Sequence, residues 1–277
     1  MGGPSRFGVV GNPIAHSLSP DIHDAFAKSL GIEMAYERYL LPEERFKDEA
    51  RALFDAGLQG LNVTVPFKQE ACAFAEEVDP LALMAGAVNT LAQKSGRIIG
   101  YNTDGIGMVR DLQVRHNINL DGASALILGA GGACRGIIQP LLNAGVETIW
   151  IGNRTLPRAQ EIVQQFQGAD GRSLSAVSLE ALSKNAPKAD LLVNSTSLGL
   201  DDGDIRLPPQ IAAGKACYDL SYGRQARFAQ WASANGASVS LDGLGMLVEQ
   251  AAESFEIWLG HRPDTEPVYQ LLRQRLG

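Results

Sequence analysis

The sequence contains few cysteines, no long apolar run and no cluster of basic residues. Its three cysteines, Cys72, Cys134 and Cys217, are odd in number, and no histidine accompanies them at metal-ligand spacing. This pattern argues against a disulfide framework and a structural zinc site, and free thiols fit a reducing cytosol. No stretch is long enough to span a bilayer, and the first residues lack the apolar core of a signal peptide. We therefore expect a cytoplasmic protein with neither a metal site nor a membrane segment.

The charge balance of the chain is acidic. The net charge is −7 at pH 7, with 20% charged and 45% hydrophobic residues, which are ordinary proportions for a globular protein. A nucleic-acid partner is not expected, because binding it would need a basic face. The 277 residues exceed what one small core requires, so we expect two domains.

A glycine-rich loop organises the second half of the sequence. It follows a short apolar run at 125–128, precedes helical apolar spacing at 134–144, and consists of Gly129, Ala130, Gly131, Gly132 and Ala133. A strand, a glycine loop and a helix in this order indicate a dinucleotide site, because glycine lets the backbone approach a pyrophosphate at a helix N-terminus. Cys134 replaces the third glycine of the usual motif and is small enough for close packing. The alternative is a turn that binds nothing, and the strand–helix context favours the cofactor.

The next predicted strand, at 148–152, ends in residues suited to a phosphate. These residues are Asn153, Arg154 and Thr155, with Arg158 about one helical turn further on. A site that prefers NAD places Asp or Glu here to bind the ribose 2′-hydroxyl, but this chain has no acid before Glu161. Because guanidinium groups suit phosphate, we expect NADP; the alternative is two solvated helix arginines.

Lys68 and Asp104 are candidates for a reactive pair. Lys68 lies just past a predicted strand at 61–65 that Pro66 ends, and ligands gather at the carboxyl ends of parallel strands. Asp104 belongs to a polar cluster at 102–104 and either caps a helix at 106–115 or partners Lys68. The sequence alone does not place the two side chains side by side, and a lone lysine is usually a solvated charge.

Hydroxyl and amide side chains elsewhere have a functional and a local interpretation. Ser17 and Ser19 form a hydroxyl pair before Pro20, and Ser19 also fits the N-cap of a helix at 21–30. Asn89 ends a small-residue loop, where an amide often bonds to its own backbone. Thr196 lies in a hydroxyl-rich loop at 195–199 that follows a buried strand, a position beside the nicotinamide in folds of this kind.

The remaining patterns predict further helices and strands. A helix opening at Pro42 runs to about Ala56, and the segment Gly57–Gly60 breaks it. We expect a hairpin of strands at 90–93 and 97–100, a loop at 242–246, and helices at 70–77, 246–258 and 267–276.

Seven motifs together resemble the shikimate dehydrogenase family nearly end to end. They lie at 11–20, 62–68, 86–90, 102–105, 129–133, 153–155 and 242–247. The resemblance implies an α/β fold with an N-terminal α/β substrate domain and a Rossmann-type cofactor domain built on a doubly wound parallel sheet. It places the substrate domain at residues 1–103, with helices of 244–277 returning to it, and the cofactor domain at 104–243.

The resemblance implies an oxidoreductase that reversibly reduces 3-dehydroshikimate to shikimate with NADPH, in chorismate and aromatic amino-acid biosynthesis. Lys68 would be the general acid and base, and Asp104 would orient Lys68 or a substrate hydroxyl. The substrate carboxylate and hydroxyls would be bound by Ser17, Ser19, Thr64, Asn89, Asp104, Tyr222 and Gln250. The 2′-phosphate would contact Asn153, Arg154, Thr155 and Arg158, and the nicotinamide end would be lined by Leu220, Gly243 and Met246.

Other functions are compatible with parts of the pattern. The nearest is a sister enzyme that also oxidises quinate, or an amino analogue, and that can use NAD. A non-catalytic dinucleotide-binding regulator would not need both Lys68 and Asp104. A folate-linked dehydrogenase of similar architecture would not explain the serine motif and the Asn-Thr-Asp-Gly motif together. The oligomeric state, for which a homodimer is one candidate, stays open.

Overall fold

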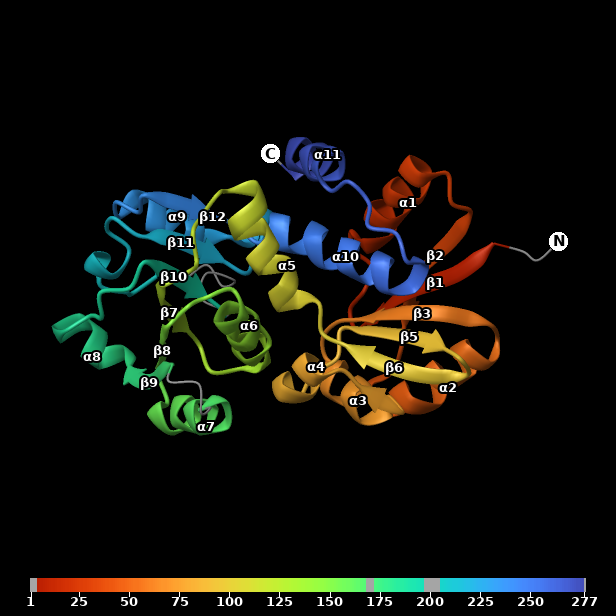
Figure 1. Cartoon of the computed structure of the whole chain (residues 1–277), viewed down its shortest axis with the longest axis horizontal. Helices are drawn as coiled ribbons and strands as arrows, with labels where there is room; N and C mark the ends of the chain where they lie inside the picture. The colour runs from red at the N-terminus through yellow and green to blue at the C-terminus, as the bar shows by residue number, and fades with distance from the viewer. Residues whose placement is uncertain (1–3, 168–171, 197–204, 277) are drawn as a thin grey trace. The chain divides into compact units, whose positions relative to one another are not determined.

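The computed structural model describes residues 4–167, 172–196 and 205–276, and it divides into two compact units. The first unit comprises Met1–Gly107 and Leu247–Gln274, and the second comprises Met108–Met246 and Arg275–Gly277. Each unit is built around one six-stranded β-sheet with helices against it (Figure 1).

The sheet of the first unit is mixed. Its strand order is β2-β1-β3-β5-β6-β4, and the strands are β1 (Ser5–Gly11), β2 (Met34–Leu40), β3 (Leu58–Val63), β4 (Glu77–Val78), β5 (Thr90–Lys94) and β6 (Arg97–Tyr101). β1 pairs in parallel with β2 and β3, whereas β5 runs antiparallel to β3 and β6. β5 and β6 are the predicted hairpin, with Ser95 and Gly96 at positive φ between them.

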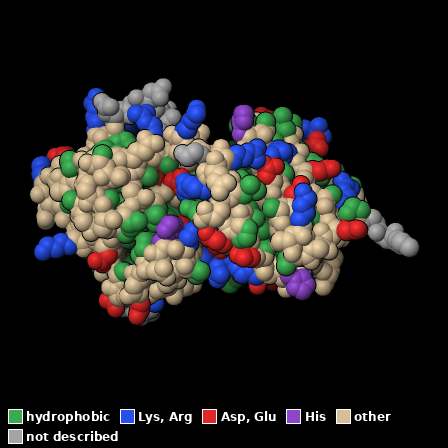
Figure 2. All heavy atoms as spheres, turned by 90° about the horizontal axis from the view of Figure 1, so that it is seen from above, with side chains coloured by type: hydrophobic (Ala, Val, Ile, Leu, Met, Phe, Trp, Pro, Cys, Tyr) green, Lys and Arg blue, Asp and Glu red, His purple; other side chains and the backbone are tan. Residues whose placement is uncertain are grey.

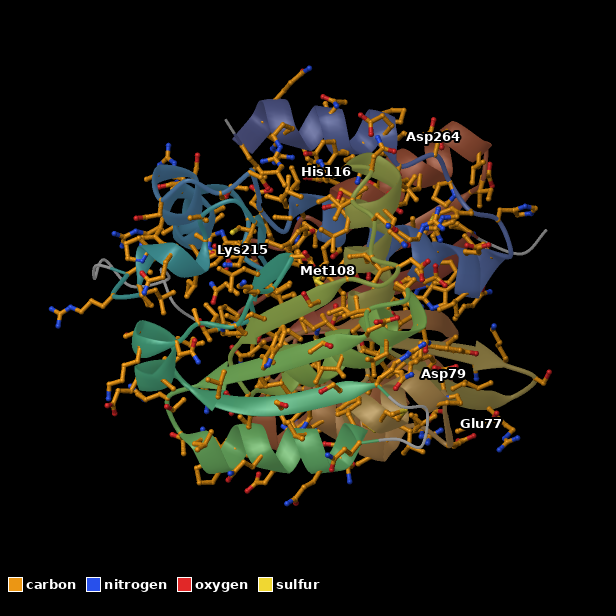
Figure 3. The ribbon with its side chains drawn as sticks, turned by 60° about the vertical axis from the view of Figure 1, so that its left-hand side comes forward. Glu77, Asp79, Met108, His116, Lys215 and Asp264 are labelled. Atoms are coloured by element: carbon orange, nitrogen blue, oxygen red, sulfur yellow. The ribbon has the colours of Figure 1, made fainter. Side chains whose placement is uncertain are left out.

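Helices cover both faces of this sheet. The helices of this unit are α1 (Ser19–Leu30), α2 (Phe46–Asp55), α3 (Lys68–Phe74), α4 (Pro80–Ala85), α10 (Leu244–Leu259) and α11 (Glu266–Leu276). Side chains alternate along β1, so Phe7 packs with Trp258 of α10 on one face, and Val10 packs with Phe46 of α2 on the other. Asp79, labelled in Figure 3, caps α4, because its Oδ1 accepts from the backbone N–H of Leu81 at 2.9 Å.

The sheet of the second unit is parallel throughout. Its strand order is β12-β11-β10-β7-β8-β9, and the strands are β7 (Ser124–Leu128), β8 (Thr148–Asn153), β9 (Ser173–Ser178), β10 (Leu191–Asn194), β11 (Ala216–Asp219) and β12 (Val239–Leu241). In chain order this is the 3-2-1-4-5-6 arrangement of a Rossmann sheet, with its switch point between β7 and β10. The predicted Rossmann-type fold is therefore confirmed.

The helices of the second unit connect these parallel strands. They are α6 (Gly132–Asn143), α7 (Leu156–Phe166), α8 (Leu179–Lys184) and α9 (Arg227–Ala234). Leu182 of α8 and Phe228 of α9 pack with Leu126 and Leu192 on one face of the sheet. α6 starts directly after the glycine loop, as the sequence predicts for a nucleotide-binding helix.

A helix precedes the second unit's sheet and ends in a wider turn than expected. α5 (Asp104–Arg110) continues as a π-helical turn, Asp111–Arg115, instead of one α-helix at 106–115. The buried carboxylate of Asp111 accepts from Arg115 Nη1 and from the Tyr218 hydroxyl, both at 2.7 Å. His116, labelled in Figure 3, follows the turn, and its Nε2 lies 3.7 Å from the same carboxylate. These contacts fasten the turn to β11.

Three further local expectations were wrong. Only Gly57 breaks the chain after α2, because Leu58–Gly60 already belongs to β3. Gly60 is a glycine because the indole of Trp258 lies where its side chain would be. The helix expected at 70–77 ends at Phe74, and α10 begins at Leu244, where Asp242 Oδ1 accepts from the backbone N–H of Leu244 at 3.2 Å.

Candidate active site

Lys68 and Asp104 form an ion pair inside the first unit. Lys68 is the first residue of α3 and Asp104 is the first residue of α5. Lys68 Nζ lies 2.5 Å from Asp104 Oδ2, and the two side chains are 29% and 19% exposed. Both charges are therefore partly shielded from water yet open to a ligand, which strengthens their interaction relative to a surface pair.

Asp104 does not act as a helix cap. Its own backbone N–H donates to Oδ1 of Asn102 at 3.1 Å, so Asn102 does the capping. The Asp104 carboxylate instead accepts from Lys68 through Oδ2 and from Asn89 Nδ2 through Oδ1, the latter at 2.9 Å. The partner interpretation of Asp104 is the correct one.

Asn89 links several predicted residues. Its Oδ1 accepts from the backbone N–H of Thr103 at 2.9 Å, and its Nδ2 lies 3.3 Å from Oε1 of Gln250 in α10. The local interpretation of Asn89, in which its amide bonds to its own turn, was wrong. The first unit thus brings Lys68, Asp104, Asn89 and Gln250 into one cluster.

Ser17 and Ser19 also lie together, but Ser19 does not play the capping role that was its alternative interpretation. The N-cap of α1 is Leu18, and Ser19 is already the first helical residue. Ser17 Oγ donates to Ser19 Oγ at 3.2 Å and also accepts from the backbone N–H of Ser19 at 3.3 Å. The pair is anchored at its own backbone and has hydroxyl groups to offer a ligand.

Thr64 and Tyr222 are less tightly defined by their surroundings. Thr64 follows β3 and is half-buried, with its backbone N–H donating to Val10 O at 2.9 Å. Tyr222 belongs to the second unit and is half-buried, and this burial raises the pKa of its phenol. Tyr222 is the one predicted substrate residue outside the first unit.

The glycine loop of the second unit leaves backbone open toward solvent. Gly129 has a φ of +107°, and a side chain there would meet Ser195 Oγ at 2.7 Å. Gly131 and Gly132 have ordinary φ values, are exposed, and have nothing within 4 Å of an added Cβ. Neither backbone strain nor crowding by the described chain requires glycine at these two positions. An approaching phosphate provides the reason, since it needs bare N–H groups.

The residues beside these glycines differ in their exposure to solvent. Ala130 is half-buried, Ala133 is exposed, and Cys134, the third residue of α6, is fully buried. Burial raises the pKa of the Cys134 thiol to about 12, so the thiol is a packing group and not a nucleophile.

The predicted phosphate residues follow β8. Asn153 is half-buried, and its Nδ2 donates to Thr155 O at 2.9 Å, which fixes the turn. Arg154, Thr155 and Arg158 are exposed. Within the described residues neither guanidinium has a hydrogen bond or an ion pair, so both are available to an anion.

Close packing and hydrogen bonds hold the predicted nicotinamide residues. Gly243 packs so closely on the carbonyl of Leu220 that no side chain fits there. The backbone N–H of Met246 donates to the Tyr218 hydroxyl at 3.2 Å. Thr196 Oγ1 donates to Asn194 Oδ1 at 2.6 Å; Ser197 to Gly199 of the same loop lie outside the described residues.

Asp219 is a buried carboxylate next to the predicted nicotinamide residue Leu220, and sequence reasoning did not single it out. Burial raises the pKa of its carboxyl to about 6, although Ser221 N–H, Asn194 Nδ2 and Phe228 N–H all donate to it. The carboxylate therefore ties β10, the segment before Tyr222 and the start of α9 together. An aspartate ending a buried strand was the signal that could have found it.

Tyr36, Arg38, Asn62 and Ser254 were also missed. The Tyr36 hydroxyl donates to Asn62 Oδ1 at 2.7 Å, and Asn62 Nδ2 donates to Ser254 Oγ at 3.0 Å. Ser254 lies four residues after Gln250 in α10, and that spacing was a usable signal. Within the described residues, no group of three or more His, Cys, Asp or Glu could hold a metal ion.

Comparison with known proteins assigns this arrangement to a family. Residues 9–91 match the shikimate dehydrogenase substrate binding domain, 112–199 match shikimate / quinate 5-dehydrogenase, and 243–273 match the shikimate 5'-dehydrogenase C-terminal domain. A shikimate dehydrogenase (NADP(+)) from Alkalilimnicola ehrlichii is 48% identical over 270 residues, which are 97% of this chain and 98% of that protein. The chain belongs to the shikimate dehydrogenase family.

Solved structures agree with this family membership. Shikimate 5-dehydrogenase from Thermus thermophilus, in complex with NADP(H) and shikimate, is 37% identical with a TM-score of 0.84, covering 98% of this chain and 99% of that one. An Ael1 enzyme from Pseudomonas putida is 35% identical with a TM-score of 0.90, covering 97% and 98%. The family resemblance drawn from the motifs is confirmed.

Surface features add little to the assignment. Figure 2 shows positive and negative side chains interspersed over the visible face. Among the described residues, no helix has both the length and the apolar character that crossing a membrane requires.

Proposed function

We propose that this chain is an NADP-dependent shikimate dehydrogenase, which interconverts 3-dehydroshikimate and shikimate. The observation that carries the proposal is the Lys68–Asp104 pair at 2.5 Å, held by Asn89 within a family whose curated members bear this activity. The first unit is the substrate domain and the second is the NADP domain. The place of shikimate in chorismate and aromatic amino-acid biosynthesis follows from the activity.

The residues of the second unit fit NADP. Gly131 and Gly132 offer open backbone at the start of α6 for the pyrophosphate. Arg154 and Arg158 are exposed cations, with Asn153 and Thr155 beside them, for the 2′-phosphate. Thr196, Leu220, Gly243 and Met246 line the nicotinamide end. Bound NADPH supplies the hydride that reduces the carbonyl carbon of 3-dehydroshikimate.

The side chains of the first unit then donate and accept the proton of the reaction. As the carbonyl carbon is reduced, its oxygen gains negative charge, which the Lys68 ammonium stabilises and then protonates. In the reverse direction neutral Lys68 removes the proton from the same hydroxyl. Asp104 fixes the lysine and accepts from a neighbouring substrate hydroxyl. Asn89 and Gln250 orient the ring hydroxyls, and Ser17, Ser19, Thr64 and Tyr222 bind the remaining polar groups.

Steady-state assays with shikimate and quinate, each with NADP and NAD, test this function. We expect shikimate with NADP to give the highest kcat/KM, because the phosphate residues lack an acid for the NAD ribose. Equal or better turnover of quinate, or of either substrate with NAD, would point to the sister enzyme. Absence of turnover with all four combinations, in protein that binds NADP, would point to the regulator.

A cytoplasmic location, the lack of nucleic-acid and membrane partners, and a homodimeric state stay predictions. Sedimentation at several protein concentrations would distinguish a homodimer from a monomer.

A further inference from the structure

Strand β2 supports the serine pair from behind with two side chains. Tyr36 and Arg38 are two residues apart on β2, so both project from the same face of the sheet. Arg38 reaches the backbone of Ser17, and Tyr36 reaches the side chain of Ser19. β2 is not part of any motif that indicates the family.

The Arg38 guanidinium binds the backbone carbonyl of Ser17 with two hydrogen bonds. Its Nε and Nη2 donate to Ser17 O at 3.1 and 2.6 Å. Two donors of a rigid guanidinium on one acceptor restrict both the position and the direction of that peptide. These two hydrogen bonds also fix a positive charge next to the Ser17 backbone, and this charge favours binding of an anionic group by the two hydroxyls.

Tyr36 controls the hydroxyl of Ser19. The Tyr36 proton is committed to Asn62 Oδ1 at 2.7 Å, so the phenol oxygen can only accept from Ser19. Burial raises the pKa of Tyr36 well above its ordinary value, so the phenol keeps its proton. Ser19 therefore donates its proton to the phenol, and this bond holds the Ser19 oxygen at a fixed point beside Ser17.

The phenol itself has no freedom to move. Its ring stacks on the buried imidazole of His23 with centroids 4.4 Å apart and planes 10° apart. Asn62 is held in turn, because its Nδ2 donates to Thr90 Oγ1 at 3.1 Å and to Ser254 Oγ at 3.0 Å. Hydrogen bonds and ring stacking therefore connect the Tyr36 phenol, which contacts Ser19, to the sheet and to α10.

We propose that Tyr36 and Arg38 are positioning residues that hold the Ser17–Ser19 pair in the geometry that receives the substrate carboxylate. This inference rests on the proposed function. The carboxylate is assigned because it is the only anionic group of shikimate and Arg38 is the cation fixed at this end of the site. Neither residue contacts the reacting carbon, so their loss weakens binding and leaves the chemical step intact.

The first experiment removes single functional groups. Tyr36→Phe deletes the hydroxyl and keeps the stacked ring, and Tyr39→Phe is the matched control on β2, since its hydroxyl donates to exposed Glu37. We expect Tyr36→Phe to raise the KM for shikimate about threefold to tenfold, the cost of one hydrogen bond, with kcat within about twofold. Tyr39→Phe should leave both constants unchanged.

The second experiment removes the charge. Arg38→Gln is compared with Arg45→Gln, whose parent side chain pairs with Glu49 on the surface. We expect Arg38→Gln to raise the KM for shikimate about tenfold, less at high salt, and Arg38→Lys to recover part of the loss. Arg45→Gln should match the wild type.

A substrate lacking the charge separates positioning from a general structural defect. Shikimate methyl ester keeps the ring and the reacting hydroxyl but has no carboxylate. The wild type should prefer shikimate over the ester, and both variants should reduce that preference by the factor that they add to the KM for shikimate. Equal losses for shikimate and its ester, or a kcat loss without a KM change, would overturn the proposal.

Failure of the proposed function would be distinguishable from failure of this inference. If the wild type does not turn over shikimate, calorimetric titration of shikimate into the wild type and Tyr36→Phe still tests the pair. Weaker binding by the variant supports the inference, whereas equal binding, or none by either protein, contradicts it.

Discussion

Asn89 and Asp104 meet through a single hydrogen bond, in which Asn89 Nδ2 donates to Asp104 Oδ1 at 2.9 Å. The other carboxylate oxygen faces Lys68 Nζ at 2.5 Å. Asp104 thus uses one oxygen for the Asn89 amide, which lies just before β5, and the other for the ammonium. Because the amide is itself held by the backbone N–H of Thr103, the carboxylate has one preferred orientation and Lys68 has one preferred place.

The first prediction concerns the proton donor. Lys68→Ala should lower kcat at least a hundredfold and change the KM for shikimate much less, because the ammonium acts on charge that develops in the transition state. Steady-state kinetics in both directions would check this. A large KM increase with kcat nearly unchanged would assign Lys68 to binding. Asp104→Asn is the companion variant, and it should also lower kcat.

The second prediction concerns cofactor choice. Arg154→Gln and Arg158→Gln should each raise the KM for NADP about tenfold and leave the KM for NAD unchanged, since only NADP carries the 2′-phosphate. Lys184→Gln is a control, because Lys184 pairs with Glu180 on the surface of the same unit. Initial rates with both cofactors at fixed salt would decide. Equal effects on NADP and NAD would show that the arginines bind no 2′-phosphate.

The third prediction separates folding from binding in the glycine loop. Gly131→Ala should leave the melting temperature unchanged, because its φ is −106° and an added Cβ meets nothing within 4 Å. The affinity for NADP should nevertheless fall at least about tenfold, since the methyl group occupies the path of the pyrophosphate.

Gly129→Ala is the contrasting variant in that loop. Its φ of +107° and the Ser195 hydroxyl 2.7 Å from the added Cβ predict a loss of stability of about 1–3 kcal/mol. Calorimetric NADP titration and thermal melts of both variants would check the pair. An unaltered NADP affinity in Gly131→Ala would mean that the cofactor approaches elsewhere.

Much of the fold could be predicted from the sequence, because its signals are local. The apolar run at 125–128 followed by glycines gave β7 and the start of α6, and the turn at Ser95 and Gly96 gave a hairpin. Local signals failed where a tertiary contact decided. Serine is a residue type that favours the N-cap, but Leu18 occupies the N-cap of α1, and the Ser19 hydroxyl forms a hydrogen bond with Tyr36.

The ion pair and the network around it could not be predicted. Lys68 and Asp104 are 36 residues apart, and their meeting depends on the order of β3, β5 and β6 in the sheet. Asn62 and Tyr36 look in sequence like polar residues alternating in half-exposed strands. Their burial follows from α10, which returns from the end of the chain and covers them, a contact that no local pattern encodes.

The last prediction concerns acid stability. His23 is fully buried, and neither ring nitrogen has a hydrogen-bond partner of normal geometry within the described chain. Burial lowers its pKa from 6.5 to about 3, which the neighbouring Asn62 offsets only slightly. The unfolded chain therefore binds a proton first as the pH falls. The stability that neutral His23 provides is complete above pH 6.5 and is lost progressively toward pH 3.

His23→Phe should remove this pH dependence, because phenylalanine keeps a ring against Tyr36 and has no nitrogen to protonate. Between pH 7.5 and 5.0 the variant should gain about 2 kcal/mol of unfolding free energy relative to the wild type. Urea unfolding at both pH values would measure this, with His261→Asn as a control at an exposed histidine. At pH 7.5 the variant should be at least as stable, since an unsatisfied buried group is gone. Parallel curves of unfolding free energy against pH for the variant and the wild type would mean that His23 is protonated in the folded protein. The description of His23 as a neutral ring stacked on Tyr36 would then be wrong.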